Sequence, residues 1–474
     1  MEIEQQQQQQ QEEQEQVLEE EELVTSFWTE ATLADAAEHL QERIHDAVDS
    51  NVLCLAQPNF VNELVEELTT SLYEEWMDME VVDELEIDDL RLWVSEQMQL
   101  YFTSGINVPP RSKPVTLDNN DNGNNNTMSE VDAKLTRLQQ VAAQLPLQRS
   151  PEWYAFRSNR LTASNLYKAL GTPAQINSLI YEKCVGKLPQ VEEQQGEDEE
   201  QQGEGEEEDE VEEKKAPRAC AWGETYELVS RLLYEHLFCT TVAEFGCIPH
   251  PTIPFLAASP DGVNVDPTSN RYGRLVEIKN VVNRVMTVEP STAHWVQCQA
   301  TMETLDLDAC DLVETKFVEL DSFESWSAHT GDKGILLHFV ARQGFDEVTG
   351  QLVSEQKGSK HVCMPFTLPR TELDVHQWTN HVVDAERQQG WVLLRPLFWY
   401  LDALRITAID RNRRWFAEAL PRLTALWDTV LQERVTGYDH RAPKKRSFAT
   451  ATTGTTGTSL FTMLVHKTEC MDVA

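Results

Sequence analysis

Residues 257–280 read AASPDGVNVDPTSNRYGRLVEIKN and contain the clearest structural pattern in the chain. The apolar residues on either side of Ser-Pro-Asp-Gly predict two short strands joined by a turn, and LVEIKN predicts a third strand. Asp261 falls in the turn. Glu277 and Lys279 are two residues apart, so their side chains point to the same face of the third strand. Two carboxylates and one amine can therefore converge.

These three side chains suit the hydrolysis of a phosphodiester bond. That reaction needs hard oxygen ligands for Mg²⁺, a cation that offsets the developing negative charge, and a group that orients or activates the attacking water. Asp261 and Glu277 offer the oxygen ligands, and Lys279 offers the cation. Taken alone, the same pattern also fits an ordinary surface turn followed by an exposed ion pair along a strand. The choice between these interpretations depends on the rest of the chain.

A third carboxylate, Glu227, lies upstream in the sequence WGETYE at residues 222–227. Residues 222–238 have the apolar spacing of a helix, and a carboxylate on that helix can reach a site formed by Asp261 and Glu277. The alternative is that Glu227 is one more solvated acid on a helix face.

The order of the expected elements indicates the fold class. A helix over 222–238 is followed by several short strands, a helix over 293–305 and a strand over 312–320. This order is typical of an α/β or α+β protein in which helices flank a sheet. Upstream we expect three helices: one around 131–143, one starting at Ser150 and Pro151, and one in LTASNLYKALG with Ser164 as its N-cap.

The charge of the chain is unevenly distributed. Its 474 residues carry a formal net charge of −41, which by itself disfavours a nucleic-acid partner, because affinity for phosphates comes largely from Lys and Arg. Two low-complexity tracts, within 1–24 and 190–216, supply over half of that excess. Residues 149–191 and 214–342 together hold 17 Lys and Arg against 19 Asp and Glu. The global charge therefore does not exclude a DNA-binding core.

Composition also predicts the organisation and location of the chain. The nine cysteines are scattered without a CxxC pair, which suits neither a disulfide framework nor a structural zinc site. No apolar run approaches the ~18 residues that a membrane span needs, and the N-terminus lacks a secretory signal, so we expect an intracellular, soluble protein. The expected segments are a disordered Gln/Glu-rich start (1–24), an acidic helical module (25–105), a linker (106–130), a main domain (131–440) that includes a disordered acidic insertion (190–216) and C-terminal helices, and a disordered tail (441–474).

Five stretches follow one another in an order that points to one family: WYAFRSNRLTAS (153–164), WGETYE (222–227), AASPDG (257–262), LVEIKN (275–280) and HWVQCQATM (294–302). Together they resemble the YqaJ-type viral recombinase family, to which the phage lambda exonuclease belongs. The resemblance implies a PD-(D/E)XK, restriction-endonuclease-like core for the main domain, with a central mixed sheet flanked by helices. It also implies cleavage of DNA with Mg²⁺ or Mn²⁺.

The resemblance assigns catalytic roles residue by residue. Glu227, Asp261 and Glu277 match the family's metal-ligating acids. The backbone carbonyl of Ile278 matches a further metal ligand. Lys279 matches the lysine that positions the attacking water and helps to deprotonate it.

Further positions match the family outside the metal ligands. Gln297 matches the family glutamine on the helix after the catalytic strand, whereas Gln299 should point elsewhere. Arg157, Ser164 and Ser259 match positions that form a pocket for a terminal 5′-phosphate. A guanidinium, hydroxyl groups and a helix N-terminus can all donate hydrogen bonds to a phosphate. The resemblance thus implies that a DNA end is bound here.

Some positions leave alternatives open. Arg160 is an alternative to Arg157 as the arginine of the 5′-phosphate pocket. Asn280 and Val281 stand where many relatives have Cys-Pro, and His294 stands where they often have Tyr; none of these changes removes a ligand. His294 could contact DNA or the metal, and the alternative is a structural role.

The leading hypothesis is an exonuclease that processes double-stranded DNA ends for recombination or repair in a large DNA virus. A single-strand annealing protein is the partner that the resemblance implies, and a homo-oligomer is compatible with it. One alternative is a structure-selective endonuclease with the same core. Another is a non-catalytic interaction protein in which acidic segments recruit partners. The basic sequence RAPKKRS at 441–447 resembles a nuclear-import signal but also fits a non-specific DNA-binding tail, so the sequence does not decide between nucleus and cytoplasm.

Overall fold

The computed structural model describes residues 30–78, 87–104, 108–115, 127–146, 150–186, 219–342, 345–346, 351–352 and 358–443. The predictions for 1–24, for the insertion 190–216 and for the tail beyond residue 443 lie outside these residues. Among the described helices, none combines the length and the apolar character that crossing a membrane requires.

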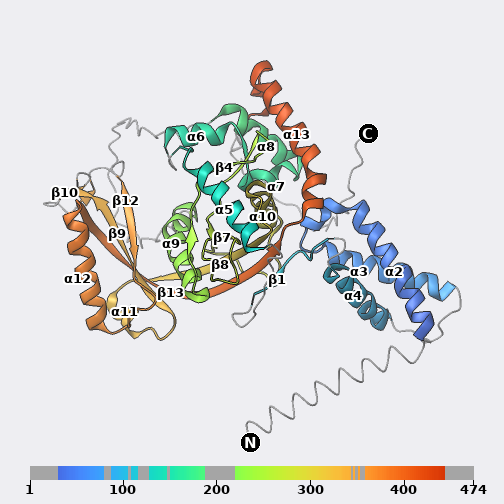
Figure 1. Cartoon of the computed structure of the whole chain (residues 1–474), viewed down its shortest axis with the longest axis horizontal. Coiled ribbons are helices and arrows are strands. Elements are labelled where there is room, and N and C mark those ends of the chain that lie inside the picture. The colour runs from blue at the N-terminus through green and yellow to red at the C-terminus, as the bar shows by residue number, and fades with distance from the viewer. Residues whose placement is uncertain are drawn as a thin grey trace, which may run out of the picture.

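Within the described residues, a mixed sheet of eight strands forms the centre of the molecule (Figure 1). The strands follow the order β12-β9-β13-β8-β7-β6-β3, and β1 pairs with β13. Only the β7–β8 pair is parallel in this described sheet. The strands are β1 (Lys113–Pro114), β3 (Val242–Ala243), β6 (Gly262–Asn264), β7 (Leu275–Asn280), β8 (Ala309–Leu320), β9 (Lys333–Ala341), β12 (Ser359–Cys363) and β13 (Trp391–Asp410).

Two helices cover opposite faces of β7. Val276 and Ile278 pack in one apolar cluster with Tyr234 of α9 (Ala219–Phe238). Leu275, on the alternate face, packs in a cluster that includes Trp295 of α10 (Thr292–Leu305). Because both faces are covered, the first four residues of the strand are buried, and the carboxylate of Glu277 among them therefore stands out. The predicted sheet flanked by helices is confirmed, as are the helices expected over 222–238 and 293–305.

A smaller sheet and a group of helices are formed by segments between Met128 and Ala258. The sheet has the order β2-β5-β4. Ser150 caps α6 as predicted: its Oγ accepts a hydrogen bond from the Trp153 backbone N–H at 3.1 Å. The elements here are α5 (Met128–Ala142), α6 (Pro151–Ser158), β2 (Leu161–Thr162), η2 (Ala163–Asn165), α7 (Leu166–Ala169), α8 (Pro173–Val185), β4 (Ile248–Pro249) and β5 (Leu256–Ala258).

The prediction that Ser164 is a helix N-cap is wrong. Ser164 lies inside the short 3₁₀ helix η2, and the α-helix that follows has Asn165 at its N-cap position without a side-chain capping bond. The Ser164 hydroxyl instead lies 3.3 Å from the hydroxyl of Thr162 and donates to Asn165 Oδ1 at 3.2 Å. The 3₁₀ turn intervenes because the chain turns sharply between β2 and α7, so the α-helix starts later and is only one turn long.

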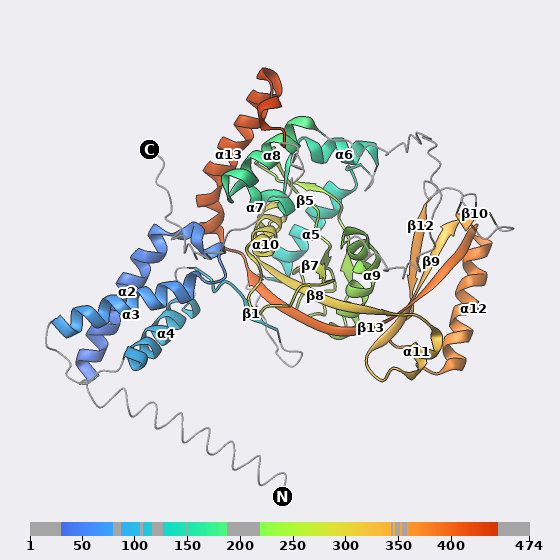
Figure 2. The same ribbon diagram turned by 180° about the vertical axis from the view of Figure 1, so that it is seen from behind.

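The region beyond residue 320 differs from the predicted C-terminal helices. α12 (Glu372–Gln388) and α13 (Arg413–Thr436) are helices, but between them runs β13, which is 20 residues long and pairs with both β8 and β9. We call β9, β12, the first half of β13, α11 (Phe323–Ala328) and α12 the distal lobe; the short strands β10 (Phe345–Asp346) and β11 (Gln351–Leu352) pair beside it. Figure 2 shows β8 and β13 continuing from the core into this lobe.

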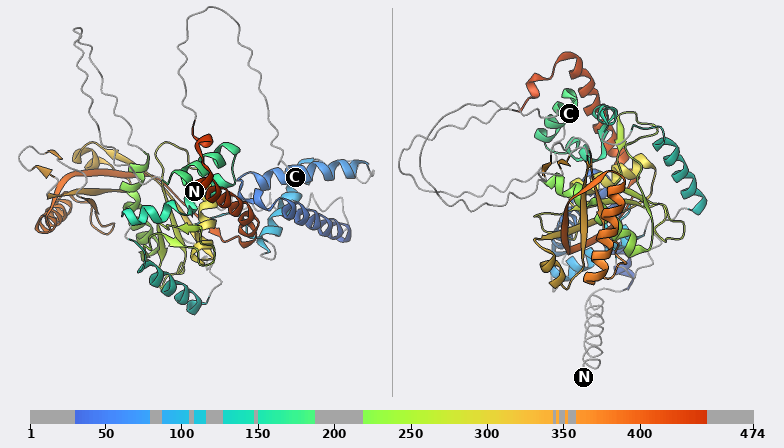
Figure 3. Two further views of the ribbon diagram at one scale, coloured as in Figure 1. Left: turned by 90° about the horizontal axis from the view of Figure 1, so that it is seen from above. Right: turned by 90° about the vertical axis from the view of Figure 1, so that its left-hand side faces the viewer.

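The N-terminal helices pack on the opposite end of the molecule from the distal lobe (Figure 3). They are α2 (Glu30–Ser50), α3 (Phe60–Asp78) and α4 (Ile87–Thr103), with the 3₁₀ helix η1 (Val52–Ala56) between the first two. Arg414 of α13 forms an ion pair with Asp49 at 2.5 Å, and Trp415 Nε1 donates to the carbonyl of Leu53. Their buried residues belong to the same apolar cluster as those of α10 and α13. The predicted helical module therefore shares its core with the main domain.

A buried ion cluster joins the loop before β7 to β8. The carboxylate of Asp311 accepts from Arg271 Nη1 at 2.6 Å and from the Tyr234 hydroxyl at 2.7 Å, and it lies 3.4 Å from Arg274 Nε. All four side chains are almost completely buried. Burial and the Asp311 charge raise the pKa of Tyr234 well above its ordinary value, so it remains a donor. One carboxylate thus stabilises two guanidinium groups inside the protein.

Candidate active site

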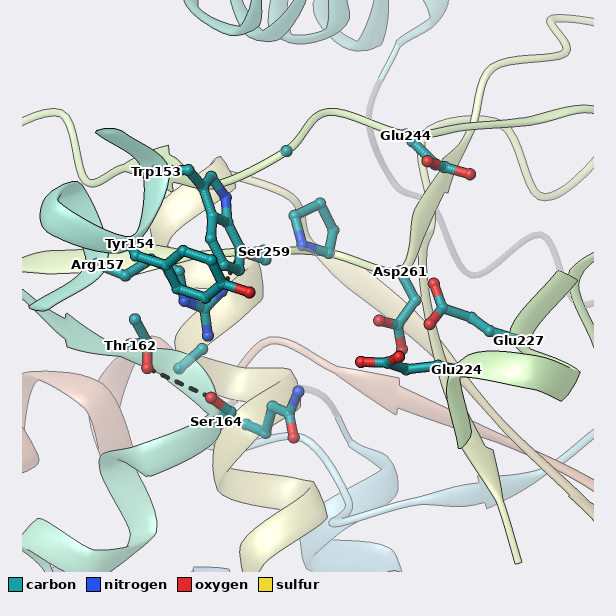
Figure 4. Close-up of a pocket in the computed structure, with 14 residues that line it drawn as sticks. Trp153, Tyr154, Arg157, Thr162, Ser164, Glu224, Glu227, Glu244, Ser259 and Asp261 are labelled. Carbon is teal, nitrogen blue, oxygen red and sulfur yellow. Dashed lines mark hydrogen bonds between the residues drawn. The ribbon is translucent and has the colours of Figure 1, made fainter. Parts of the chain in front are cut away.

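Six of the nine predicted site residues line a single cavity of about 380 Å³ with two chemically different ends (Figure 4). The other three, Glu277, Ile278 and Lys279, lie on β7 and do not line it. Asp261, Glu224 and Glu227 lie together at one end. Arg157, Ser164 and Ser259 lie at the other end, beside Trp153 and Tyr154. The lining residues are Trp153, Tyr154, Arg157, Thr162, Ala163, Ser164, Glu224, Glu227, Glu244, Gly246, Ser259, Pro260, Asp261 and Gln297.

The acidic end is organised around β7. Asp261 Oδ2 accepts a hydrogen bond from the Ile278 backbone N–H at 2.7 Å, which fixes the turn to the strand. Lys279 Nζ donates to Glu277 Oε1 at 2.6 Å, and the amide nitrogen of Gln297, on α10, donates to the same oxygen at 2.5 Å. The structure therefore brings these five residues together.

Electrostatics at this end favour a bound cation. Burial, followed by the charge of Asp261, raises the pKa of Glu277, although Lys279 acts in the opposite direction. For Lys279, burial lowers the pKa, but the charges of Glu277 and Asp261 outweigh it, so the pKa is raised and the amine stays protonated. The two carboxylates therefore repel one another at close range, and one cationic side chain only partly offsets them.

The residues present fit a divalent metal ion. Glu277 is completely buried, and its Oε2 has no hydrogen-bond partner among the described residues. A buried carboxylate oxygen without a donor is costly unless a cation supplies the missing interaction. Hard carboxylate oxygens are the ligands that Mg²⁺ prefers. As the side chains stand, no group of three His, Cys, Asp or Glu residues in the described ranges is close enough to hold an ion. Asp261 and Glu277 are thus the pair that fits best, and Glu227 lies close to Asp261 at the same end of the cavity (Figure 4).

The helix that carries Glu227 is tied to the end of β7. Asn280 Nδ2 donates to the carbonyl of Gly223 at 2.9 Å, and Asn280 Oδ1 accepts from the hydroxyls of Ser230 and Thr315 at 2.6 and 2.8 Å. Asn280 was noted in the sequence only as a departure from relatives. In the structure it sets the position of α9 relative to the catalytic strand, and hence of Glu227.

The other end of the cavity carries the candidate phosphate ligands. Arg157 Nη1 donates to Ser259 Oγ at 2.7 Å, and its guanidinium lies 4.5 Å from the centroid of the Trp153 ring. Ser164 reaches this end through the 3₁₀ turn described above. Guanidinium and hydroxyl groups at one end, opposite carboxylates at the other, give the cavity a built-in polarity.

The C-terminal helix α13 holds this end in place. Arg434 Nη2 donates to the carbonyls of Ser158 and Lys183 at 3.0 and 2.6 Å, and its Nη1 donates to Asn159 Oδ1 at 3.0 Å. Ser158 follows Arg157 directly, at the end of α6. Arg434, which is 276 positions from Ser158 in the chain, therefore stabilises the helical turn that presents Arg157.

The structure distinguishes between several alternatives from the sequence. Arg160 donates to the Phe156 carbonyl and lies over the Phe156 ring, and it does not line the cavity. Gln299 points away as predicted, because its side chain bonds the backbone of Asp410 and Asn412. His294 also lies outside the cavity lining, 3.9 Å from Glu314, and burial lowers its pKa to about 3.

Sequence reasoning missed part of the lining. Glu224 lies three residues before Glu227 on α9, so helical spacing places both on one face, and WGETYE contains both acids. Trp153 and Tyr154 stand in the same quoted stretch as Arg157 but were not singled out. The aromatic pair, with ring centroids 4.9 Å apart, forms a wall beside the arginine.

Comparison with known proteins places this cavity in a family. The model of the YqaJ-like viral recombinase domain matches residues 152–305. An uncharacterised protein of Acanthamoeba polyphaga mimivirus is 23% identical over 316 residues, which cover 60% of this chain and 52% of that protein. The chain thus spans about half the length of this curated relative.

Two solved structures are also similar. One is an alkaline exonuclease, LHK-Exo, from Laribacter hongkongensis, with 17% identity and a TM-score of 0.32 over 60% of this chain and 95% of that one. The other is LHK-Exo in complex with dAMP, with 17% identity and a TM-score of 0.31 over the same shares. The family match spans every residue that lines the cavity, from Trp153 to Gln297. Residues 152–305, which hold the candidate active site, therefore match the YqaJ-like viral recombinase domain.

Proposed function

We propose that this chain is a metal-dependent deoxyribonuclease, an exonuclease that hydrolyses phosphodiester bonds at the ends of double-stranded DNA. The observation that carries the proposal is the polarity of one cavity, with carboxylates at one end and an arginine and serine cluster at the other. At the carboxylate end, Asp261 accepts a hydrogen bond from the strand that carries Glu277 and Lys279. A phosphodiester to be cut fits the first end. A terminal phosphate on the same strand fits the second.

Each residue at the acidic end has a distinct task. Asp261, Glu277, Glu227 and the Ile278 carbonyl would hold Mg²⁺ or Mn²⁺, which when bound supplies Lewis-acid stabilisation and a more acidic water. Lys279 orients the water and offsets negative charge on the phosphate, because its raised pKa keeps it a cation. Gln297 lines the cavity and fixes Glu277 by donating a hydrogen bond to its Oε1, which leaves Oε2 for the metal ion.

The arginine end would set the mode of cleavage. An enzyme that grips a terminal 5′-phosphate starts at a DNA end, whereas an endonuclease needs no such pocket. We infer that the product is single-stranded DNA for recombination or repair, with a single-strand annealing protein as the partner that uses it. The mimivirus relative supports a role in a large DNA virus.

The direct test compares linear with covalently closed circular duplex DNA. With Mg²⁺, the wild-type chain is expected to degrade linear DNA progressively and to leave closed circles intact, and EDTA is expected to stop the reaction. Gel analysis over time gives the result. Equal cutting of circles would indicate an endonuclease, and no cutting of either substrate would leave only an interaction role.

Arg157→Ala is expected to reduce the preference for a 5′-phosphorylated end. A charge-assisted hydrogen bond to phosphate contributes about 1.5–3 kcal/mol, so the ratio of kcat/KM for phosphorylated over hydroxyl ends should fall on the order of ten- to a hundredfold. Arg160→Ala is the matched control, since Arg160 is three residues along and outside the cavity. An unchanged ratio in Arg157→Ala would rule out the phosphate pocket but not the nuclease.

A further inference from the structure

A second cavity, of about 780 Å³, lies beside the same helix that borders the candidate active site. Ala221, Trp222 and Thr225 of α9 line it, whereas Glu224 and Glu227 of α9 line the first cavity. At 3.6 residues per turn these two sets lie on different faces of the first two turns of the helix. The second cavity therefore begins directly behind the carboxylates of the first.

The floor of the second cavity comes from strands that enter the distal lobe. Arg395, Pro396, Leu397 and Phe398 of β13 line it, together with Glu319, Leu320 and Asp321 at the end of β8. The carboxylate of Glu319 already accepts a hydrogen bond from Tyr226 at 2.9 Å. Arg395 is exposed and, within the described part of the chain, makes no hydrogen bond or ion pair. A cation of the cavity thus remains available for an anion from solvent.

Arg395 is the first of a row of basic side chains across the sheet of the distal lobe. Strand register pairs Arg395 with His338 of β9, and His338 with His361 of β12. The two imidazoles stack with their centroids 4.4 Å apart. Directly opposed residues share a face of a sheet, so the three side chains form one row, here called the Arg-His row.

The Arg-His row lies on the face that α9 only partly covers. Leu397, Leu336 and Cys363, two positions along the three strands, pack against Trp222 and Tyr226 of α9. The opposite face is closed by α12, whose Val375 packs with Leu337 and Phe339. The row therefore lies on the same face of the sheet as α9, next to the part that α9 covers.

Arg395 supplies a positive charge to the row. Burial lowers the pKa of His361 to about 4, and His338 and Arg395 add to this lowering. At neutral pH the imidazole is neutral and retains one N–H donor. A guanidinium without an ion pair, next to imidazole donors, is the chemistry that binds the phosphates of a nucleic-acid backbone without reading its bases.

We propose that the second cavity and the Arg-His row bind the sugar-phosphate backbone of the DNA whose end is processed in the first cavity. This rests on the proposed function, and it extends the DNA-binding surface beyond the matched residues 152–305 into the distal lobe. The strand passes over the N-terminal turns of α9, with Glu224 and Glu227 on one side and Arg395 on the other. The contact holds the substrate without taking part in the bond cleavage.

The test measures DNA binding by the full chain in EDTA, so that cleavage does not interfere. Fluorescence anisotropy gives Kd for a 5′-phosphorylated duplex and for the single strand of the same sequence, at several salt concentrations. Loss of one phosphate contact reduces the slope of log K against log salt by roughly 0.9 for duplex DNA and roughly 0.7 for a single strand. The probe, duplex or single strand, whose affinity and salt slope are lower for the variant than for wild type is the form of DNA that this surface binds.

Arg395→Ala is expected to weaken binding about tenfold at low salt and to reduce the slope by about one unit, independently of sequence. Arg395→Lys is expected to keep the slope, since the charge remains. The matched control is Arg387→Ala: Arg387 is also exposed and in the distal lobe, but on α12, which covers the other face. Circular dichroism of each variant checks that the fold is intact.

The results separate this inference from the proposed function. If Arg395→Ala binds both probes with wild-type Kd and salt slope, or if Arg387→Ala loses as much, the Arg-His row does not bind DNA. If wild type cuts linear DNA with Mg²⁺ while Arg395→Ala keeps the wild-type Kd and salt slope, only this inference fails and the proposed function stands. If DNA binding depends on Arg395 but wild type does not cut DNA with Mg²⁺, the DNA-binding surface is supported and the proposed nuclease function is contradicted. Absence of DNA binding by wild type contradicts both.

Discussion

Lys279→Ala is expected to lower the rate of Mg²⁺-dependent cleavage of linear DNA by about a thousandfold, which corresponds to roughly 4 kcal/mol in the activation barrier. Lys279 is the cation bonded to Glu277 at 2.6 Å, and its side chain is 23% exposed, so it is partly accessible to solvent. Alanine removes the charge that offsets the phosphate and the group that orients water. Single-turnover rates with saturating enzyme measure the chemical step without a contribution from product release.

The matched control is Lys316→Ala. Lys316 lies on the adjacent strand β8, and its exposed ion pair with Asp402, at 2.6 Å, contributes little to stability. This variant should cut at the wild-type rate. Glu277→Gln should lose activity to a similar extent as Lys279→Ala, because the amide removes a negative ligand. Folded Lys279→Ala protein that cuts within tenfold of wild type would contradict the assignment of the site.

Asp311→Ala is expected to cost about 3–5 kcal/mol of unfolding free energy, the largest stability effect that we predict. The substitution leaves the guanidinium groups of Arg271 and Arg274 buried without their shared carboxylate. Burying an uncompensated charge costs far more than the loss of a surface pair. Urea denaturation followed by circular dichroism gives the free energy and shows whether the transition remains cooperative.

Asp402→Ala serves as the comparison. Its side chain is 38% exposed and pairs with Lys316, so the expected loss is below about 1 kcal/mol. Asp311→Ala protein as stable as the Asp402 variant would show that the buried cluster is replaceable. Because Asp311 is the register partner of Val276, next to Glu277, the variant should also lose part of its activity if the cluster holds β7 in place.

The core of the site was predictable because its signals are local. Glu277 and Lys279 share a face through the period of two along a strand, and Asp261 is recognisable from the turn chemistry around it. The structure confirms that these side chains converge, through the hydrogen bond from Lys279 to Glu277 within β7 and the one from the Ile278 backbone N–H to Asp261. Their metal-binding role stays a prediction.

What was missed depends on contacts between distant segments. Asn280 bonds Gly223, Ser230 and Thr315, which come from a helix and a strand on either side of it in the sequence. Nothing near Asn280 indicates these partners. β13 was missed for a related reason: its apolar residues carry no sign of the strands that pair with it, and helices precede and follow it in the chain.

The sheet order has a consequence for where the protein can be divided. The family match ends at residue 305, yet β8, the parallel neighbour of the catalytic strand, begins at Ala309, and β13 covers the other edge of β8. A fragment cut at the boundary of the match would leave β7 with an open edge and unpaired backbone groups beside Glu277 and Lys279. The recognisable family segment and the cooperative folding unit are therefore different stretches of this chain. The candidate catalytic residues lie within the first, but the strand pairing that holds β7 extends into the second.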